Sequence, residues 1–274
     1  MEKHLKIAIL GAGNIGSAIA EGLHDSGAFD TAGIILTRRN LAHLSSLAEK
    51  GFVIQSDNRK AVRESELIII AVEPQQLDPL LEEIAADVDE KKHVIISVVT
   101  GAGIRQIEKR LAKKPPVVRA MPNTAIAIRE SMTCLATNGG DPKAMKMAET
   151  VFSTVGETMQ IDEEQMSAAT ALGACGVAFF LRAIRAASQG GIEIGFHSDK
   201  ALKIAAQTAK GAASLLLQTK NHPEFEIDRV TTPRGVTISG LNQMEHEGLS
   251  SAMIRGIVTS AEKAAKLYSP EEDD

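Results

Sequence analysis

The sequence has few cysteines and no excess of basic residues, so it lacks the composition of a secreted disulfide-rich protein or of a nucleic-acid-binding protein. It contains only two cysteines, Cys134 and Cys175, both in apolar contexts, so we expect no disulfide framework and a reducing, cytoplasmic location. The chain opens M-E-K-H-L-K-I-A-I-L, without a secretory cleavage pattern. Its 30 Lys and Arg residues do not outnumber its 35 Asp and Glu residues, and the net charge is -5. A nucleic-acid partner would normally require a basic face, so we expect none.

Long apolar runs are also missing. The longest uncharged apolar run covers residues 168–181 and is 14 residues long, whereas a membrane-spanning helix needs about 20. We therefore expect a buried helix there and no membrane partner. The remaining composition, 44% hydrophobic and 24% charged over 274 residues, is typical of a globular protein with enough chain for two modest domains.

Short apolar runs alternate with helix-like segments through the first part of the chain. The runs predict strands at residues 5–10, 34–36, 52–54, 67–72, 94–98 and 117–118, and the segments between them predict helices at 15–23, 41–50, 74–86 and 104–111. This alternation predicts an α/β fold with a Rossmann-type, doubly wound and mainly parallel sheet. Two more strands, at 132–136 and 158–161, with a helix at 142–152 between them, are expected to extend the sheet edge.

After Ile161 the composition becomes alanine-rich and helical. An acidic first turn at residues 162–164 suits a helix start, and helices are predicted at 163–189, 199–218, 238–246 and 250–267. We therefore predict a dinucleotide-binding domain at 1–161 and an all-helical C-terminal domain at 162–274, which binds substrate. So much apolar surface on few helices favours a homo-oligomer assembled through this domain. A self-contained helical bundle is the alternative.

A glycine motif follows the first predicted strand. Gly11, Ala12, Gly13, Asn14, Ile15 and Gly16 match G-x-G-x-x-G between a strand and an amphipathic helix. In that setting Gly11 allows a tight turn, Gly13 lets a pyrophosphate approach and Gly16 lets the helix pack closely. The motif predicts a nicotinamide dinucleotide cofactor, and a glycine turn without a ligand is the alternative.

The end of the second predicted strand indicates which dinucleotide binds. NAD sites usually carry an acidic residue there to bind the ribose 2′-hydroxyl, but this chain has Thr37, Arg38, Arg39 and Asn40. A guanidinium can make paired hydrogen bonds to phosphate, which favours NADP and leaves NAD as the alternative. Loops after later strands should line the same cleft. These loops are residues 71–75, 97–101 and 119–124.

The stretch of residues 230–241, V-T-T-P-R-G-V-T-I-S-G-L, places hydroxyls, a proline and a glycine where a helix is expected to begin. The first backbone N–H groups of a helix lack intrahelical partners and lie at the positive end of its dipole. This segment therefore predicts a site for a small carboxylate. His222 and His246 flank it without metal-ligand spacing, and no metal is expected.

With these motifs the chain resembles the pyrroline-5-carboxylate reductase family, which reduces a cyclic imine to proline with NAD(P)H. The resemblance covers nearly the whole chain. It rests on G-A-G-N-I-G at 11–16, A-V-E-P-Q at 71–75, R-A-M-P-N-T at 119–124, A-A-T-A-L at 168–172 and T-P-R-G-V-T-I-S-G-L at 232–241.

The resemblance implies cofactor contacts and a substrate site. Cofactor contacts are expected from Gly11, Ala12, Gly13, Asn14, Ile15, Gly16, Thr37, Arg38, Asn58, Ala71, Val72, Pro74, Ser97 and Gly101. The carboxylate of a small cyclic imine would be held by the Thr232 hydroxyl and by the backbone N–H groups of Gly235, Val236 and Thr237. The Thr237 hydroxyl would lie near the ring nitrogen as the catalytic group.

Three departures from the family pattern stand out. Glu73 replaces the lysine that is common in A-V-K-P-Q. Residues 173–179 read G-A-C-G-V-A-F in place of S-G-S-G-P-A-Y. Residues 232–237 read T-P-R-G-V-T in place of S-P-G-G-T-T, with Arg234 as a new side chain. Arg234 either draws in the carboxylate or points into solvent. Solvent is favoured, because backbone N–H groups alone can hold an anion.

A protonated imine is already electrophilic, so the protein mainly has to orient it and hold its carboxylate. This agrees with the lack of a histidine or carboxylate beside the motifs, since a hydroxy-acid dehydrogenase needs a base. Two other hypotheses remain. One is another reductase of the same architecture, either an imine reductase or a 3-hydroxy-acid enzyme, and the latter would need a lysine such as Lys200, Lys203 or Lys210 for proton transfer. The other is a catalytically silent NADP-sensing protein.

Overall fold

The computed structural model describes residues 4–139 and 141–267. Contacts within the chain divide it into two compact units. The first unit runs to Cys175 and also contains the chain from Val258 onward, and the second is Gly176–Ile257. The contact boundary thus falls after Cys175, later than the domain boundary that the sequence predicts after Ile161.

The first unit is built on an eight-stranded sheet with the order β3-β2-β1-β4-β5-β6-β7-β8. Neighbouring strands are parallel except β6 and β7, which are antiparallel. This doubly wound, mainly parallel sheet confirms the predicted fold class. The strands are β1 (Ile7–Leu10), β2 (Ile34–Thr37), β3 (Val53–Gln55), β4 (Leu67–Ile70), β5 (Val94–Ser97), β6 (Val117–Met121), β7 (Ser131–Thr137) and β8 (Gly156–Gln160).

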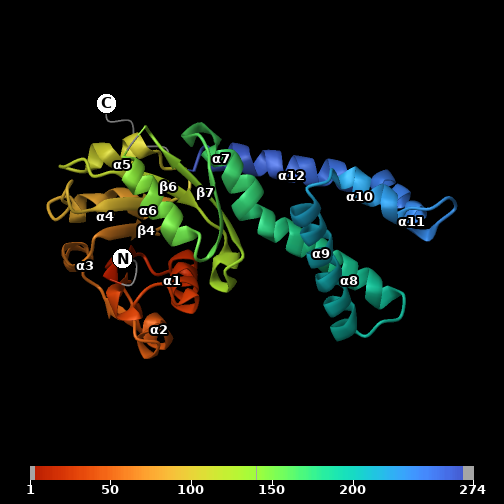
Figure 1. Ribbon diagram of the computed structural model, residues 1–274, viewed down its shortest axis with the longest axis horizontal. Coiled ribbons are helices and arrows are strands. Elements are labelled where there is room, and N and C mark those ends of the chain that lie inside the picture. Colours follow the sequence, from red (N-terminus) through yellow and green to blue (C-terminus); the bar gives the residue numbers. More distant parts are fainter. Residues whose placement is uncertain (1–3, 140, 268–274) are drawn as a thin grey trace. The chain divides into compact units, whose positions relative to one another are not determined.

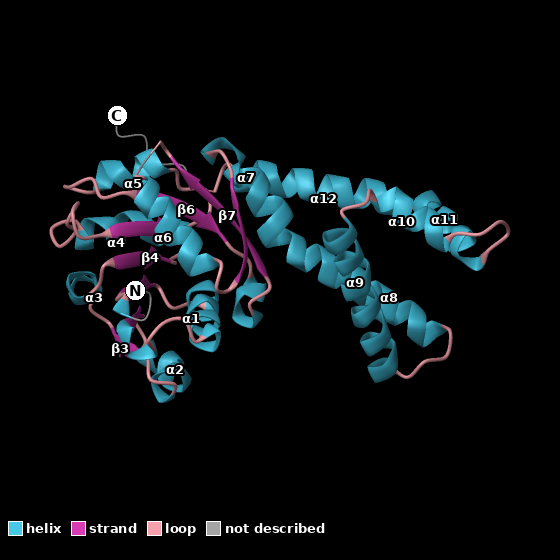
Figure 2. Ribbon diagram, in the orientation of Figure 1, coloured by secondary structure: helices cyan, strands magenta, loops and turns pink. Residues whose placement is uncertain are grey.

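Helices cover both faces of this sheet (Figures 1 and 2). The strands β1 and β4 are buried on both faces and carry unbroken apolar runs, as expected for central parallel strands. One face packs against α1 (Asn14–Ser26), α2 (Ser45–Glu49) and α6 (Pro142–Phe152). The other packs against α3 (Asn58–Glu64), α4 (Leu77–Ile84) and α5 (Ile104–Arg110).

Single helical turns complete the first unit. They are η2 (Thr31–Gly33), η3 (Leu41–Leu44), η4 (Pro74–Gln76), η5 (Thr124–Ile128) and η6 (Glu163–Gln165), followed by the short helix α7 (Met166–Ala169). A π-helical segment, η7 (Thr170–Cys175), then leads to the end of the unit. The sequence predicted one regular helix through residues 163–189, so this change of helical winding is a correction.

The second unit is helical, as predicted. It contains α8 (Gly176–Glu193), α9 (Ser198–Thr219), α10 (Pro223–Val230) and α11 (Val236–His246), and α12 (Leu249–Ala264) begins in it. The helices α8 and α9 pack closely, because a Cβ on Gly191 would lie 3.1 Å from the Cβ of Ala201. The helix α10, like α3 in the first unit, was not predicted.

Large apolar side chains remain exposed on the helices of the second unit. Phe180 is 61% exposed and Leu217 78%, and Ile194, in the turn directly after α8, is 78% exposed. By length and composition, the helical stretch Glu163–Glu193 could cross a membrane, and only 17% of its most apolar window is buried. One such helix is weak evidence for a membrane span. The prediction of no membrane partner therefore remains a prediction.

Candidate functional site

The glycine loop between β1 and α1 contains glycines with two different tasks. Gly11 has φ of 95°, and a Cβ there would lie 2.7 Å from the carbonyl oxygen of Ala71. A Cβ on Gly16 would lie 2.4 Å from the carbonyl oxygen of Gly11. Both positions therefore need glycine for the fold itself. A Cβ on Gly13, in contrast, would meet nothing within 4 Å, which leaves open space above the start of α1.

The end of β2 fixes this loop from the side. The carbonyl oxygen of Thr37 accepts hydrogen bonds from the N–H groups of Gly11 (3.2 Å) and Ala12 (2.8 Å). The Thr37 side chain is buried and its Oγ1 accepts from Gly11 N at 3.3 Å. Arg38 donates from Nη1 to the carbonyl oxygen of Ala12 at 3.1 Å. In this structure Thr37 therefore supports the loop, and Arg38 spans the gap between the loop and the strand end.

The α1 N-terminus is open to an anion. Gly13 is the N-cap residue, and no side chain caps the helix. Asn14 is exposed and Ile15 half-buried, whereas Ala12 is fully buried. The free N–H groups at this end, together with the open space above Gly13, fit the pyrophosphate of a dinucleotide.

The loops that leave β4 and β5 lie beside the glycine loop, because these strands follow β1 in the sheet. Ala71 is buried and donates from its N–H to the carbonyl oxygen of Leu10 at 2.8 Å. Ser97 is buried and its Oγ accepts from Val99 N at 3.3 Å. These loops can therefore offer a ligand their backbone and the half-buried residues Val72, Pro74 and Gly101. Asn58 begins α3, where its amide donates to Glu83 Oε2 at 3.0 Å.

The sequence predicted Arg119 in a loop, but in the structure it lies inside the protein. It belongs to β6, where it pairs in register with Ser97, and its side chain is 8% exposed. Its Nη1 lies 3.5 Å from Glu163 Oε1, and the same carboxylate oxygen accepts from Ile104 N at 2.6 Å. Burial lowers the pKa of Arg119 from its usual value, and the charge of Glu163 opposes that shift. Glu163 thus joins β6 to the start of α5.

Asn123 of the M-P-N motif is also used within the protein. It is 8% exposed, its Oδ1 accepts from Ala125 N at 3.0 Å and its Nδ2 donates to the carbonyl oxygen of Gly173 at 3.2 Å. Both ends of this amide therefore make structural contacts within the protein, and the prediction that residues 119–124 line the cofactor cleft remains a prediction. Asn123 holds the π-helical segment η7 against the end of β6. No sequence signal indicated a π-helical turn at Gly173.

The second unit contains the predicted substrate segment. The Gly235 N–H donates to the carbonyl oxygen of Thr232 at 2.8 Å, which closes a four-residue turn directly before α11. A Cβ on Gly235 would lie 2.4 Å from Thr232 Oγ1, so glycine is required there. The helix begins at Val236 without a side-chain cap, and Val236 is 91% exposed. Thr237, in the first turn, is half-buried. The predicted helix start at this segment is thus present, two residues earlier than expected.

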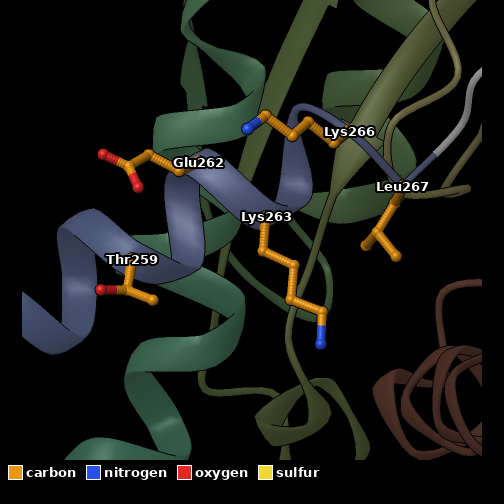
Figure 3. Close-up of a pocket in the computed structure, with 5 residues that line it drawn as sticks. All are labelled: Thr259, Glu262, Lys263, Lys266 and Leu267. Carbon is orange, nitrogen blue, oxygen red and sulfur yellow. The ribbon is translucent and has the colours of Figure 1, made fainter.

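A pocket of about 450 Å³ lies at the C-terminal end of α12, and none of the predicted site residues lines it (Figure 3). Thr259, Glu262, Lys263, Lys266 and Leu267 line it. The side chains of Lys263 and Lys266 point in different directions, so they do not form a cationic cradle. Cations at the last turn of a helix favourably offset its dipole. Among residues 4–139 and 141–267, no cluster of three potential metal ligands occurs.

Two family models match the chain. The model described as pyrroline-5-carboxylate reductase dimerisation matches residues 163–267, and the model described as NADP oxidoreductase, coenzyme F420-dependent, matches residues 6–101. Pyrroline-5-carboxylate reductase 2 of Dictyostelium discoideum is 50% identical over 97% of this chain and 94% of its own length. Pyrroline-5-carboxylate reductase 1 of that organism is 52% identical over 98% of this chain, which spans 51% of that protein's length.

Solved structures show the same fold. The crystal structure of Plasmodium falciparum pyrroline carboxylate reductase with NADP bound has a TM-score of 0.90 at 21% identity, over 98% of this chain and 100% of that one. A pyrroline-5-carboxylate reductase from Coxiella burnetii has a TM-score of 0.87 at 28% identity, over 97% of this chain and 99% of that one.

The sheet order and the uncapped helix start at the glycine loop are typical of the dinucleotide-binding fold of oxidoreductases. The similarity to named relatives extends through both units of the chain. The chain belongs to the pyrroline-5-carboxylate reductase family. The family predicted from the sequence motifs is thereby confirmed.

Proposed function

We propose that this chain reduces the C=N bond of 1-pyrroline-5-carboxylate to give proline, with NADPH as the reductant. The observation that carries this proposal is the 50% identity to a named reductase over 97% of the chain. That identity includes the dinucleotide unit and the helical unit alike. This activity is the last step of proline biosynthesis.

The cofactor half of the reaction belongs to the glycine loop. The first N–H groups of α1 would hold the pyrophosphate above Gly13, because the space there is open and the helix start is uncapped. The other residues proposed for cofactor contact follow from the family. When bound, the reduced nicotinamide supplies the hydride. Arg38 and the exposed Arg39 favour the 2′-phosphate of NADP.

The substrate half belongs to the turn before α11. The N–H groups of Val236 and Thr237 and the Thr232 hydroxyl would hold the carboxylate of the imine, since no side chain caps this helix start. The Gly235 N–H, which the family resemblance also implied, is bound to the carbonyl oxygen of Thr232, so Gly235 would shape the turn. The Thr237 hydroxyl would accept or donate a hydrogen bond at the ring nitrogen. A threonine is a weak acid, so the imine enters in its protonated form or takes its proton from water. Positioning is the chief contribution of these residues.

We further propose that the chain works as a homo-oligomer in a reducing, cytoplasmic compartment. The dimerisation model covers residues 163–267, which include most of the exposed apolar side chains, among them Phe180 and Leu217. A partner subunit would remove this surface from water. Cys134 and Cys175 are both free, as expected where thiols stay reduced.

The decisive assay follows the loss of reduced nicotinamide absorbance when 1-pyrroline-5-carboxylate is added to the protein with NADPH or NADH. We expect turnover with this imine and none when hydroxy acids are offered with the oxidised cofactor. Turnover with the hydroxy acids instead would support a 3-hydroxy-acid dehydrogenase. Flat traces with retained NADPH binding would support a sensing protein.

The role of Thr237 is tested by an isosteric pair of variants. Thr237→Val keeps the shape and removes the hydroxyl, and Thr237→Ser keeps the hydroxyl. A hydrogen bond to a charged group contributes about 1.5–3 kcal/mol, so Thr237→Val should lower kcat/KM by roughly 10-fold or more. Thr237→Ser should retain most of it. Equal kinetics for both variants and the unaltered chain would exclude the proposed role.

A further inference from the structure

Arg234 holds an unusual backbone conformation. Among the residues that the structure describes, three other than glycine have positive φ: Arg129 (60°), Lys220 (57°) and Arg234 (57°). The first two end helical segments: Arg129 caps η5 and Lys220 caps α9. A left-handed residue is the common way to end a helix. Arg234 instead precedes a helix, so this explanation does not extend to it.

The turn of residues 232–235 explains why position 234 has a positive φ, but it does not explain why that residue is arginine. Pro233 stands second and Arg234 third in a turn closed by the bond from Gly235 N to the carbonyl oxygen of Thr232. A type II turn has positive φ at its third position and prefers glycine there. The left-handed region is unfavourable for a residue with a Cβ. Arginine at this position therefore works against the local backbone preference, which is a reason to look for a function.

The guanidinium of Arg234 has no partner in the described part of the chain. Arg234 is exposed, and it makes none of the hydrogen bonds or ion pairs found between residues 4–139 and 141–267. The neighbouring Arg229, in contrast, donates to Glu226 Oε2 at 3.1 Å. The guanidinium of Arg234 is therefore uncommitted, and Arg234 directly precedes Gly235, the N-cap residue of the uncapped helix α11, in the chain.

We propose that Arg234 is a specificity-determining residue, which attracts the carboxylate of the cyclic imine and so selects carboxylated imines over neutral ones. This inference rests on the proposed function, because it takes the start of α11 as the carboxylate site. The N–H groups would orient the anion at short range. The Arg234 charge would raise the affinity of that site for an anion and the rate at which anions reach it.

The test compares two substrates that differ by one charge: 1-pyrroline-5-carboxylate and 1-pyrroline. Arg234→Gln should lower kcat/KM for the carboxylated imine by about 10-fold, chiefly through KM. It should leave kcat/KM for 1-pyrroline unchanged. Arg234→Lys keeps the charge and should retain most of the selectivity. Rising salt should reduce the carboxylate preference of the unaltered chain more than that of Arg234→Gln.

Arg229→Gln is the matched control, since it changes the net charge of the same unit equally but removes a committed arginine. It should leave the selectivity between the two imines intact. Arg234→Gly supplies a second signature: it should raise KM for the carboxylated imine while the melting temperature rises or stays level, because glycine suits the turn. A merely structural arginine would not separate these two readouts.

Unchanged selectivity in Arg234→Gln would overturn the inference while the unaltered chain still reduces 1-pyrroline-5-carboxylate. A loss of equal size in Arg229→Gln would overturn it too, since a general charge effect would then suffice. Failure of the unaltered chain to reduce either imine would instead refute the proposed function, and this inference with it.

Discussion

The glycines at positions 13 and 16 should respond in opposite ways to the same substitution. Alanine at position 16 would place a Cβ 2.4 Å from the carbonyl oxygen of Gly11, so either the turn or the helix must shift. Alanine at position 13 would meet nothing within 4 Å, and φ of −83° there is open to alanine. Gly16→Ala should therefore damage the fold, whereas Gly13→Ala should damage cofactor binding.

The magnitudes follow from these contacts. Forcing an extra carbon into a packed site costs about 1–3 kcal/mol of unfolding free energy, which we expect for Gly16→Ala. Replacing an N-cap glycine by alanine costs at most about 1 kcal/mol, so Gly13→Ala should fold almost normally. Its methyl group would occupy the space where the pyrophosphate should approach. Losing one or two charge-assisted hydrogen bonds of about 1.5–3 kcal/mol each would weaken NADPH binding by roughly 10-fold to 100-fold or more.

Thermal unfolding with and without NADPH separates the two effects. Cofactor at about 100 times its Kd should stabilise the unaltered chain by about 2.7 kcal/mol. Gly13→Ala should melt normally without NADPH, and at the same concentration the stabilisation should fall to about 1.4 kcal/mol for a 10-fold weaker Kd and to about 0.4 kcal/mol for a 100-fold weaker one. Gly16→Ala should melt early even without NADPH. The reasoning fails if Gly13→Ala keeps the full shift, or if it unfolds as early as Gly16→Ala.

Three further predictions concern the first unit. Gly22→Ala would place a Cβ 2.3 Å from the carbonyl oxygen of Ile126 and should lower the unfolding free energy by about 1–3 kcal/mol in denaturant titrations, unlike Gly33→Ala, whose nearest contact is 3.5 Å. Burial lowers the pKa of His93 below its usual 6.5. The neutral imidazole therefore contributes fully to the free energy of unfolding above pH 6.5, and this contribution is lost as the pH falls from there toward the lowered pKa. His93→Asn should flatten this part of a stability-against-pH curve, and an unchanged slope would contradict the assignment. Glu163→Gln leaves the buried Arg119 without its counter-charge and should cost about 1–3 kcal/mol, part of which Arg119→Met should restore in the double variant.

The sheet could be predicted because its strands carry a strong local signal. The apolar runs at residues 67–70 and 94–97 are short, rich in β-branched residues and fully or largely buried, as central parallel strands require. The helix α6 was predicted with its observed bounds because Asp141 and Pro142 mark its start. Local composition and helix caps are enough for such elements.

The missed elements lack such a signal. The helix α3 has seven residues, five of them polar or charged, and only Ala61 and Val62 are buried. The helix α10 is only eight residues long, and its three apolar residues are too few to show a helical period in the sequence. The π-helical turn at Thr170–Cys175 makes a contact with Asn123, fifty residues before Gly173 in the chain. Local patterns cannot reveal such a long-range contact.

The polar residues of the M-P-N region show that a correctly recognised motif can contain internal contacts that the sequence does not reveal. The sequence places Arg119 and Asn123 after a strand at the cofactor edge, where free side chains would contact a ligand. In the structure both are buried and point to the segment of residues 163–175, through Glu163 and through the carbonyl oxygen of Gly173.

Those two contacts also give a physical reason for the position of the contact boundary. Buried polar groups need partners, and the partners of Arg119 and Asn123 lie in the first stretch of the region that is helical by composition. Separating that stretch from the sheet would leave a buried guanidinium and a buried amide unsatisfied. The chain therefore changes composition after Ile161, but it leaves the first unit only after Cys175.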